Sequence, residues 1–459
     1  MTSRIPNLLR MILLVSGATL LSSCGNPKPA VVSRPAAGSS SRGDGTSHSA
    51  VSQPSEGTSP GQEISSGEES GVSSSPSFNT TPDHSSSSRL ENPTTASRTQ
   101  SVTTVPAASS TSPALSSTAP APQPTASHSI PLTDSRIRYN GRVAVKEGAA
   151  YIDWSCSGLE INVQGGDVRV QLTAAAQNDL QCTYIGVYVN GRRTAKVRLA
   201  TGTQWYTLAN HLDAGAVTNI KIVKLNEASL SSFTVKELEV TGTLAAKTPD
   251  KSRRIQWIGD SITAGYGILS PNAAAPFKAE TEDGTLTYAA KISQALDADF
   301  HVVAASGYGV ALDNSGGSSA LIPPLYGYTQ WFRDRTTKWD CSRFQPDLVV
   351  VNLGTNDVAG GAKADVLKSG VTGFLQQLRQ AHPQAQIVWV YGMMINVREA
   401  EIRAAVESFA AGDSKVHYLS LPLQNTSADG AGSGGHPSVK TNQKVADNLA
   451  PRLQSLMGW

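Results

Sequence analysis

The C-terminal part of the chain alternates short apolar runs with segments whose apolar residues repeat at helical spacing. The runs cover residues 255–258, 302–304, 348–353 and 387–391. Runs of this length without a regular polar alternation are typical of parallel strands covered on both faces. Alternating strands and helices predict a parallel sheet between two layers of helices. Binding and catalytic sites in such sheets form at the carboxyl ends of the strands.

Three segments predict the helices of this region. Their shared helical faces carry Tyr288, Ile292 and Ala295; then Leu367, Val371, Phe374 and Leu378; and finally Val445, Leu449, Leu453 and Leu456. Such spacing is typical of amphipathic helices that cover a sheet. We expect Pro451 to kink or interrupt the last of them, because proline lacks the N–H that a helix interior needs.

Residues 135–246 have a different period. Val168, Val170 and Leu172 alternate with polar residues, and Asn190-Gly191 is a hairpin signal. No long helical pattern interrupts these residues. They predict a small all-β, antiparallel jelly-roll sandwich that precedes the α/β region.

Residues 25–134 are dominated by Ser, Thr, Pro, Ala and Gly. Such a segment has too little apolar area to offset the entropy of ordering, so we interpret it as a disordered linker. The formal net charge of the whole chain is only +2, and neither sign clusters. This balance gives no electrostatic footprint for nucleic acid, and it favours a neutral substrate over a polyanion.

Residues 1–24 are typical of a bacterial lipoprotein signal peptide. Arg4 and Arg10 precede the apolar run 11–21, which is too short to span a membrane comfortably. Leu21-Ser22-Ser23-Cys24 resembles a lipobox, in which the cysteine is acylated. We therefore expect export and a lipid anchor on Cys24 in a bacterial membrane, at the cell surface or in the periplasm. The alternative is an ordinary secretory signal that contains a cysteine.

Cys156 and Cys182 both fall in the predicted β region. In an oxidising compartment they are candidates for a disulfide, and the alternative is two small buried hydrophobic residues. No Cys or His pair has the spacing of a zinc site, so we expect no metal and no cofactor.

The residues after three predicted strands are suited to acyl transfer. Gly259-Asp260-Ser261 follows the first run, Gly307 follows the second, and Asn356 follows the third. Ser261 is the candidate nucleophile. The N–H groups of Ser261 and Gly307 and the amide of Asn356 are candidate oxyanion-hole donors, which stabilise the negative charge that develops on a substrate oxygen. Each residue alone also fits an ordinary turn or helix cap.

A nucleophilic serine needs a base, and His436 is the best candidate among the eight histidines. It lies in the glycine-rich loop 430–437, which precedes the last helix. His301, His382 and His417 lie beside predicted strands or helix ends and are expected to be structural.

These blocks resemble the SGNH (GDSL) hydrolase superfamily, whose domain has a flavodoxin-like three-layer α/β/α fold. The longer stretches 259–267, 306–309 and 346–357, behind a β-sandwich, resemble carbohydrate esterase family 2 in particular. The resemblance covers about residues 137–459. It implies removal of acetyl groups from plant polysaccharides such as xylan or glucomannan without a metal, with Ser261 as nucleophile and His436 as base.

One departure from the superfamily concerns the group that orients the histidine. The superfamily usually has Asp three residues before the base, where this chain has Ser433. We predict a Ser-His dyad in which a main-chain carbonyl of the loop or the Ser433 hydroxyl orients the imidazole. Asp429 is the less favoured candidate for an orienting acid.

The sequence thus predicts a signal peptide at 1–24, a linker at 25–134, a β-sandwich at 135–246 and a hydrolase domain at 252–459. We interpret the chain as a carbohydrate acetyl esterase that acts on an acetylated polysaccharide through an acetyl-enzyme. The alternatives are another esterase of the superfamily (a lipase, thioesterase or peptidoglycan O-acetyl esterase) and a non-catalytic carbohydrate-binding lipoprotein.

Two groups of aromatic residues are relevant to carbohydrate binding. Trp154, Trp205 and Tyr206 are expected mainly in the sandwich core, with a sugar-binding face as the alternative. Tyr328, Trp331 and Trp339 form either a sugar platform or ordinary packing, and the sequence does not favour one over the other.

Overall fold

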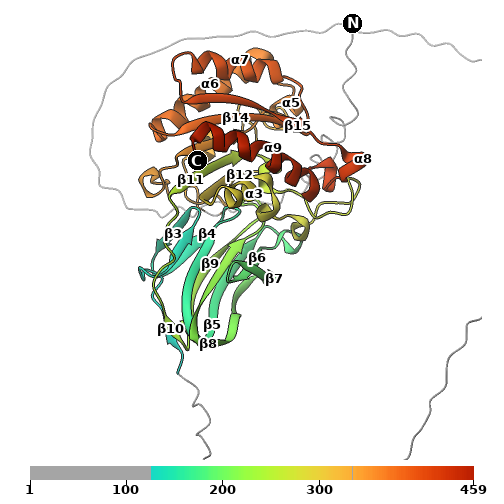
Figure 1. Ribbon diagram of the computed structural model, residues 1–459. Coiled ribbons are helices and arrows are strands. Elements are labelled where there is room, and N and C mark those ends of the chain that lie inside the picture. Colours follow the sequence, from blue (N-terminus) through green and yellow to red (C-terminus); the bar gives the residue numbers. More distant parts are fainter. Residues whose placement is uncertain (1–125, 333) are drawn as a thin grey trace, which may run out of the picture. The chain divides into compact units, whose positions relative to one another are not determined.

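The computed structural model describes residues 126–332 and 334–459, which form an antiparallel β region followed by a parallel α/β region (Figure 1). Both predicted fold classes are confirmed. The predicted signal peptide, its Cys24 and most of the predicted linker lie outside the described residues. In the described ranges, no helix is long and apolar enough to cross a membrane.

Ten strands make up the β region, and every pairing in it is antiparallel. They are β1 (His128–Ser129), β2 (Arg138–Asn140), β3 (Val143–Lys146), β4 (Ala149–Ile152), β5 (Gly158–Ala176), β6 (Tyr184–Val189), β7 (Arg192–Arg198), β8 (Gly202–Lys224), β9 (Ser231–Val240) and β10 (Thr243–Leu244). The main order is β3-β4-β9-β5-β8-β6-β7, with β1 on β9 and with β2 and β10 on β5.

The alternation predicted for this region matches its burial. Val168, Val170 and Leu172 of β5 are buried in the core between the strands. The register of β5 against β8 shifts near Gly165 and Gly166, both at positive φ, which is the conformation that glycine adopts most easily.

The start of the β region lies earlier than the sequence predicted. Ile130 and Leu132 fall in the predicted linker, yet both are buried in the β core beside β1. Two isolated apolar side chains in a polar segment give no periodic signal, so their burial depends on the strands that surround them.

The α/β region is built on a five-stranded parallel sheet. Its strands are β11 (Arg253–Gly259), β12 (Ala298–Ala304), β13 (Leu348–Asn352), β14 (Gln386–Met393) and β15 (Val416–Leu423). Their spatial order is β12-β11-β13-β14-β15. In sequence terms this is the 2-1-3-4-5 order of flavodoxin-like folds, in which ligands bind at the carboxyl ends of the strands near the switch in strand order.

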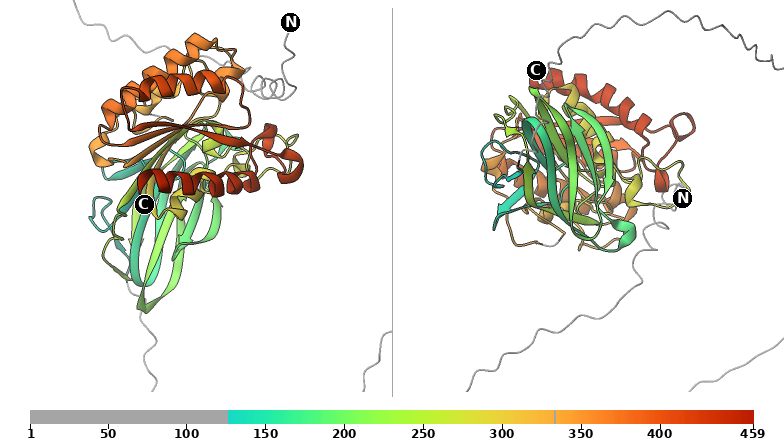
Figure 2. Two further views of the ribbon diagram at one scale, coloured as in Figure 1. Left: turned by 45° about the horizontal axis from the view of Figure 1, so that its top comes forward. Right: turned by 90° about the horizontal axis from the view of Figure 1, so that it is seen from below.

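Helices cover both faces of this sheet (Figure 2). α3 (Tyr288–Ala295) and α9 (Val439–Met457) lie on one face, and α6 (Ala364–Ala381) and α7 (Glu399–Ala410) lie on the other. Four shorter helices lie in the connections: α2 (Ser261–Ala264), α4 (Ile322–Tyr326), α5 (Thr355–Ala359) and α8 (Thr426–Asp429).

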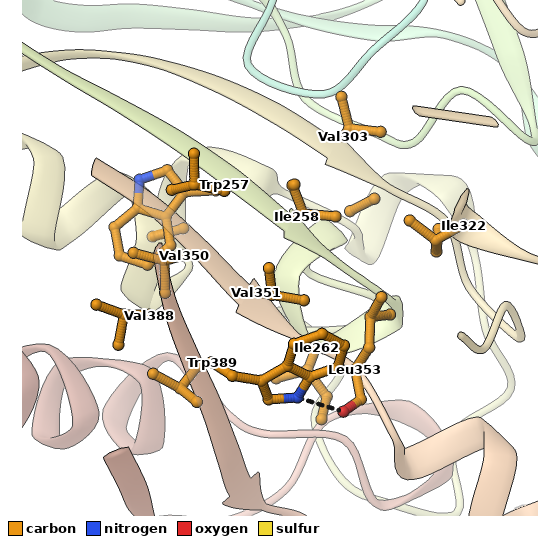
Figure 3. Packing of buried hydrophobic residues seen from close by; sticks show 14 of the residues in the cluster. Trp257, Ile258, Ile262, Val303, Ile322, Val350, Val351, Leu353, Val388 and Trp389 are labelled. Carbon is orange, nitrogen blue, oxygen red and sulfur yellow. Dashed lines mark hydrogen bonds between the residues drawn. The ribbon is translucent and has the colours of Figure 1, made fainter. Parts of the chain in front are cut away.

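Large apolar side chains between the layers fix the strand ends that carry the candidate site. Trp257 of β11 and Trp389 of β14 are fully buried in the apolar cluster between the sheet and its helices (Figure 3). The indole N–H of Trp389 donates to the carbonyl of Leu353 at 3.2 Å. This bond anchors the chain at the carboxyl end of β13, just before Asn356.

The last helix is not interrupted, although interruption was one of the two outcomes expected of Pro451. α9 runs without a break through Pro451. Val445, Leu449 and Leu453 are buried on its inner face, and this packing outweighs the hydrogen bond that proline cannot make.

The predicted disulfide is absent, because Cys156 and Cys182 are both free. Cys156 is buried in the cluster that extends into the α/β region. The sulfur of Cys182 instead accepts a hydrogen bond from the Arg198 guanidinium at 2.9 Å. The alternative reading, two small buried side chains, describes them correctly.

Candidate active site

Ser261 is the first residue of α2, directly after β11. Asp260 caps this helix by accepting the N–H of Ile262 at 2.9 Å. A side chain on Gly259 would collide with the Thr263 hydroxyl, at 2.1 Å from its Cβ. Glycine at 259 thus leaves room for the Thr263 hydroxyl, and Asp260 caps the helix that begins at Ser261.

His436 lies in the loop between β15 and α9 and reaches Ser261 from 175 positions away. Its Nε2 is 2.8 Å from the Ser261 Oγ. The loop is held against the segment after α2, because the N–H of Ser433 donates to the carbonyl of Gly267 at 3.2 Å. A side chain on Gly267 would collide with Ser433.

The carbonyl of Ser433 determines which tautomer His436 adopts. It accepts the N–H of His436 Nδ1 at 2.9 Å. A carbonyl only accepts, so in the neutral ring the proton is on Nδ1 and Nε2 is free to accept the Ser261 hydroxyl proton. The Ser433 hydroxyl is engaged elsewhere, since it donates to the carbonyl of Ala275.

Asp429 does not contact the histidine. Its carboxylate pairs with the ammonium groups of Lys444 at 2.7 Å and Lys440 at 3.2 Å. Of the two candidate orienting residues, the structure places only Ser433 against His436, through its main chain.

Burial lowers the pKa of His436 to about 4. The ring of Tyr266 lies 4.5 Å from the imidazole, centre to centre, and Phe277 stacks on Tyr266. A charged imidazolium is poorly solvated in these surroundings, whereas the Ser433 carbonyl favours it slightly. The resting dyad therefore holds a neutral imidazole.

The second predicted block supplies a main-chain donor beside Ser261. Gly307 has φ +84° in the turn after β12. Across the residues that the structure describes, no acceptor is bonded to the N–H of Gly307 or of Ser261. Both are available to a substrate oxygen.

Asn356 lies at the same edge of the sheet, at the start of α5, but its amide is already engaged. Nδ2 donates to the Tyr308 carbonyl at 2.8 Å and to the Asp260 carboxyl at 3.3 Å. Asn356 becomes an oxyanion donor only when a substrate oxygen replaces one of these two acceptors.

Two buried carboxyl groups brace the loops around the site. Asp357 accepts the N–H groups of Val310, Ala311 and Leu312 at 2.7–3.0 Å. Burial raises the pKa of Asp357, and it raises that of Asp260 to about 7. Both residues act on loop geometry.

The other histidines of the α/β region have structural partners. His382 pairs with the Tyr326 hydroxyl at 2.6 Å, His417 pairs with Gln386 at 2.8 Å, and His301 stacks on Phe344. In the part of the chain that the structure describes, no cluster of three His, Cys, Asp or Glu side chains is arranged to hold a metal ion.

Of the two alternatives for Tyr328, Trp331 and Trp339, ordinary packing describes both tryptophans. Trp331 and Trp339 are buried, and Trp331 stacks on Trp154 of the β region. Trp205 is the exposed member of the first group, at 38%. The edge of Trp331 meets Tyr308, so this tryptophan supports the loop after β12.

Sequence reasoning assigned no role to Tyr266, although it is in the quoted stretch 259–267. It also missed Gln424, whose amide donates to the carbonyl of Gly435 at 2.8 Å and so holds the histidine loop. Nothing in the local sequence distinguishes Gln424 from an exposed polar residue.

Comparison with known proteins identifies both regions. Residues 257–444 match the GDSL-like Lipase/Acylhydrolase family, and residues 139–249 match the Carbohydrate esterase 2 N-terminal family. Along the chain, the Carbohydrate esterase 2 N-terminal match covers the β region and the GDSL-like match that follows covers the α/β region, with the boundary near residue 250.

Curated relatives share this arrangement. Cellulase/esterase CelE of Acetivibrio thermocellus is 29% identical over 333 residues, which are 70% of this chain and 40% of that protein. The chain thus spans less than half the length of CelE. An acetylxylan esterase / glucomannan deacetylase of Cellvibrio japonicus is 26% identical over 72% of this chain and 92% of its own length.

Among solved structures, a family two carbohydrate esterase from Clostridium thermocellum in complex with cellohexaose is similar to this chain. Its TM-score is 0.66 at 27% identity, and the match covers 70% of this chain and 99% of that one.

We expect the His436 imidazole to titrate near pH 4 in the free protein, because burial disfavours its charged form. Histidine ring resonances followed by NMR from pH 3 to 8 measure this value, and a His436→Gln variant assigns the signal. Titration near the ordinary pKa of about 6.5 would show that the ring is solvated and would contradict the geometry.

Proposed function

We propose that the chain, which matches the Carbohydrate esterase 2 N-terminal family at residues 139–249 and the GDSL-like Lipase/Acylhydrolase family at residues 257–444, is an esterase that removes O-acetyl groups from carbohydrate. The observation that carries this proposal is the 2.8 Å contact between Ser261 Oγ and His436 Nε2 beside two free N–H donors.

In the proposed first step, Ser261 Oγ attacks the acetyl carbonyl carbon while its proton moves to His436 Nε2. The carbonyl oxygen becomes negative and is stabilised by the N–H groups of Ser261 and Gly307, and by Asn356 once it exchanges an acceptor. The bond from the carbonyl carbon to the sugar oxygen then breaks. His436 returns the proton to that oxygen, which leaves an alcohol and acetyl-Ser261.

In the second step, His436 Nε2 takes a proton from water, and the water oxygen attacks the acetyl group. Collapse of the intermediate releases acetate as His436 reprotonates Ser261. The Ser433 carbonyl keeps the proton on Nδ1 through both steps, so the site works as a dyad with no orienting carboxylate.

The proposed substrate is an acetylated polysaccharide of the xylan or glucomannan type. The similarity to an acetylxylan esterase / glucomannan deacetylase supports this class. The near-neutral charge of the chain suits a neutral polymer.

We expect the protein to release acetate from acetylated xylan or glucomannan and from a short-chain aryl acetate. Ser261→Ala should lower kcat by about 10⁴-fold or more, because the nucleophile is lost. Acetate release is measured with acetylated peptidoglycan and long-chain esters as further substrates. Preference for acetylated peptidoglycan would replace the xylan or glucomannan assignment, and preference for long-chain esters would replace the carbohydrate assignment. Hydrolysis of no ester would leave only a binding role.

We further propose that the protein is exported and anchored by lipid on Cys24, which keeps the enzyme close to the cell on a long linker. The support is the sequence alone: an apolar run of signal-peptide length ends at Cys24, and the Ser/Thr/Pro-rich segment follows directly.

Metabolic labelling with a fatty-acid analogue is expected to label the full chain in a bacterial host, whereas Cys24→Ala should be unlabelled and released from membranes. Cys341→Ala is the matched control and should keep the label. An unlabelled wild-type chain would contradict the anchor.

A further inference from the structure

A buried carboxylate of the β region holds the loop that carries Gly307. Glu227 lies between β8 and β9, 79 residues before Ser306 in the sequence. Its Oε2 accepts the N–H of Ser306 at 2.7 Å. Glu227 is 1% exposed, so its carboxylate makes this contact away from bulk water.

The bond fixes one side of the peptide unit that carries the Gly307 N–H. On the other side, the Gly307 carbonyl accepts the N–H of Asn314 at 3.0 Å, and the N–H of Tyr308 donates to Ala305 at 3.3 Å. A peptide unit is planar, so anchoring the residues on both sides of it fixes the direction of its N–H. Glu227 holds the start of the loop, and Asp357 holds its continuation at residues 310–312.

Glu227 lies where the β region meets the α/β region, among other buried charged groups. Burial raises its pKa, while the Ser306 N–H and the positive charge of Lys224 oppose that rise. The Lys224 ammonium is itself buried and donates to the carbonyls of Asn226 at 2.6 Å and Glu227 at 2.9 Å. Glu282 lies close enough that its charge and that of Glu227 disfavour each other. A carboxylate in such a site is costly unless it makes a specific bond.

The β region also holds a second loop, which meets the loop after β12 where Trp331 contacts Tyr308. Asp153 accepts the N–H groups of Trp331 and Phe332, both at 2.9 Å, and the Trp154 indole donates to the Thr329 carbonyl at 3.0 Å. The β region therefore supports the active site. Its residue Glu227 bonds Ser306, which directly precedes the oxyanion donor Gly307.

We propose that Glu227 is a positioning residue for the esterase reaction: through Ser306 it holds the Gly307 N–H in the direction that stabilises the oxyanion. This role rests on the proposed function. It also gives the N-terminal domain a part in catalysis that is independent of any sugar binding.

Two variants separate the hydrogen bond from packing. Glu227→Gln keeps an oxygen that accepts the Ser306 N–H, whereas Glu227→Met has similar bulk and no such acceptor. With a short-chain aryl acetate, we expect Glu227→Met to lower kcat by about 10- to 100-fold with KM within about twofold, because a misplaced oxyanion donor weakens only the transition state. Glu227→Gln should stay within about threefold of the wild type.

The matched control is Asn226→Ala. Its side chain bonds Cys182 and Ser231 within the β region and does not touch the loop after β12. This variant should lower the free energy of unfolding in urea yet leave kcat of the folded protein unchanged. Glu227→Leu provides a second side chain without an acceptor, should Glu227→Met fail to fold.

Three results would overturn the role of Glu227: wild-type kcat in an acceptor-free variant, a loss in Glu227→Gln as large as that in Glu227→Met, or an equal loss in Asn226→Ala. A wild-type protein that hydrolyses no ester would instead overturn the proposed function itself, and the role of Glu227 with it.

Discussion

The hydrogen bond between Ser261 Oγ and His436 Nε2 is the contact on which the rest of the account depends. The two residues are 175 positions apart, and they meet only because parallel strands end at one edge of the sheet. The 2-1-3-4-5 order brings the end of β11 between those of β12 and β13, so the turn of Gly307 and the helix of Asn356 flank Ser261. The fold thus brings loops that are far apart in the sequence to one edge of the sheet.

The buried carboxyl groups near this contact support the surrounding loops and do not activate the base. Asp260, Asp357 and Glu227 each accept main-chain N–H groups of the loops around the site. His436 is oriented by a neutral carbonyl instead. A neutral, poorly solvated imidazole is a weak base, but it is already deprotonated below neutral pH. The negative charge that develops on the substrate oxygen is stabilised by N–H donors, while a carbonyl and not a carboxylate accepts the Nδ1 proton of the imidazole.

The sequence predicted the fold class, because apolar runs indicate strands. It also predicted that Ser261 and His436 lie in one site, because sites in parallel sheets form at the carboxyl ends of the strands. It predicted less where a contact joins distant segments. Glu227 gave no signal, since a lone glutamate in a β region is usually solvated. The choice between a disulfide and two buried side chains at Cys156 and Cys182 stayed open for the same reason: the sequence suggests that two cysteines share a region, but only the packed structure shows what each one faces.

The most direct test of the dyad is the rate at which a fluorophosphonate labels Ser261 in the wild type, Asp429→Ala and His436→Ala. Labelling reports the activated serine without depending on the identity of the substrate. The structure predicts one label per chain, at the wild-type rate in Asp429→Ala and much more slowly in His436→Ala. A loss in folded Asp429→Ala approaching the roughly 10⁴-fold effect of removing a triad aspartate would contradict the dyad.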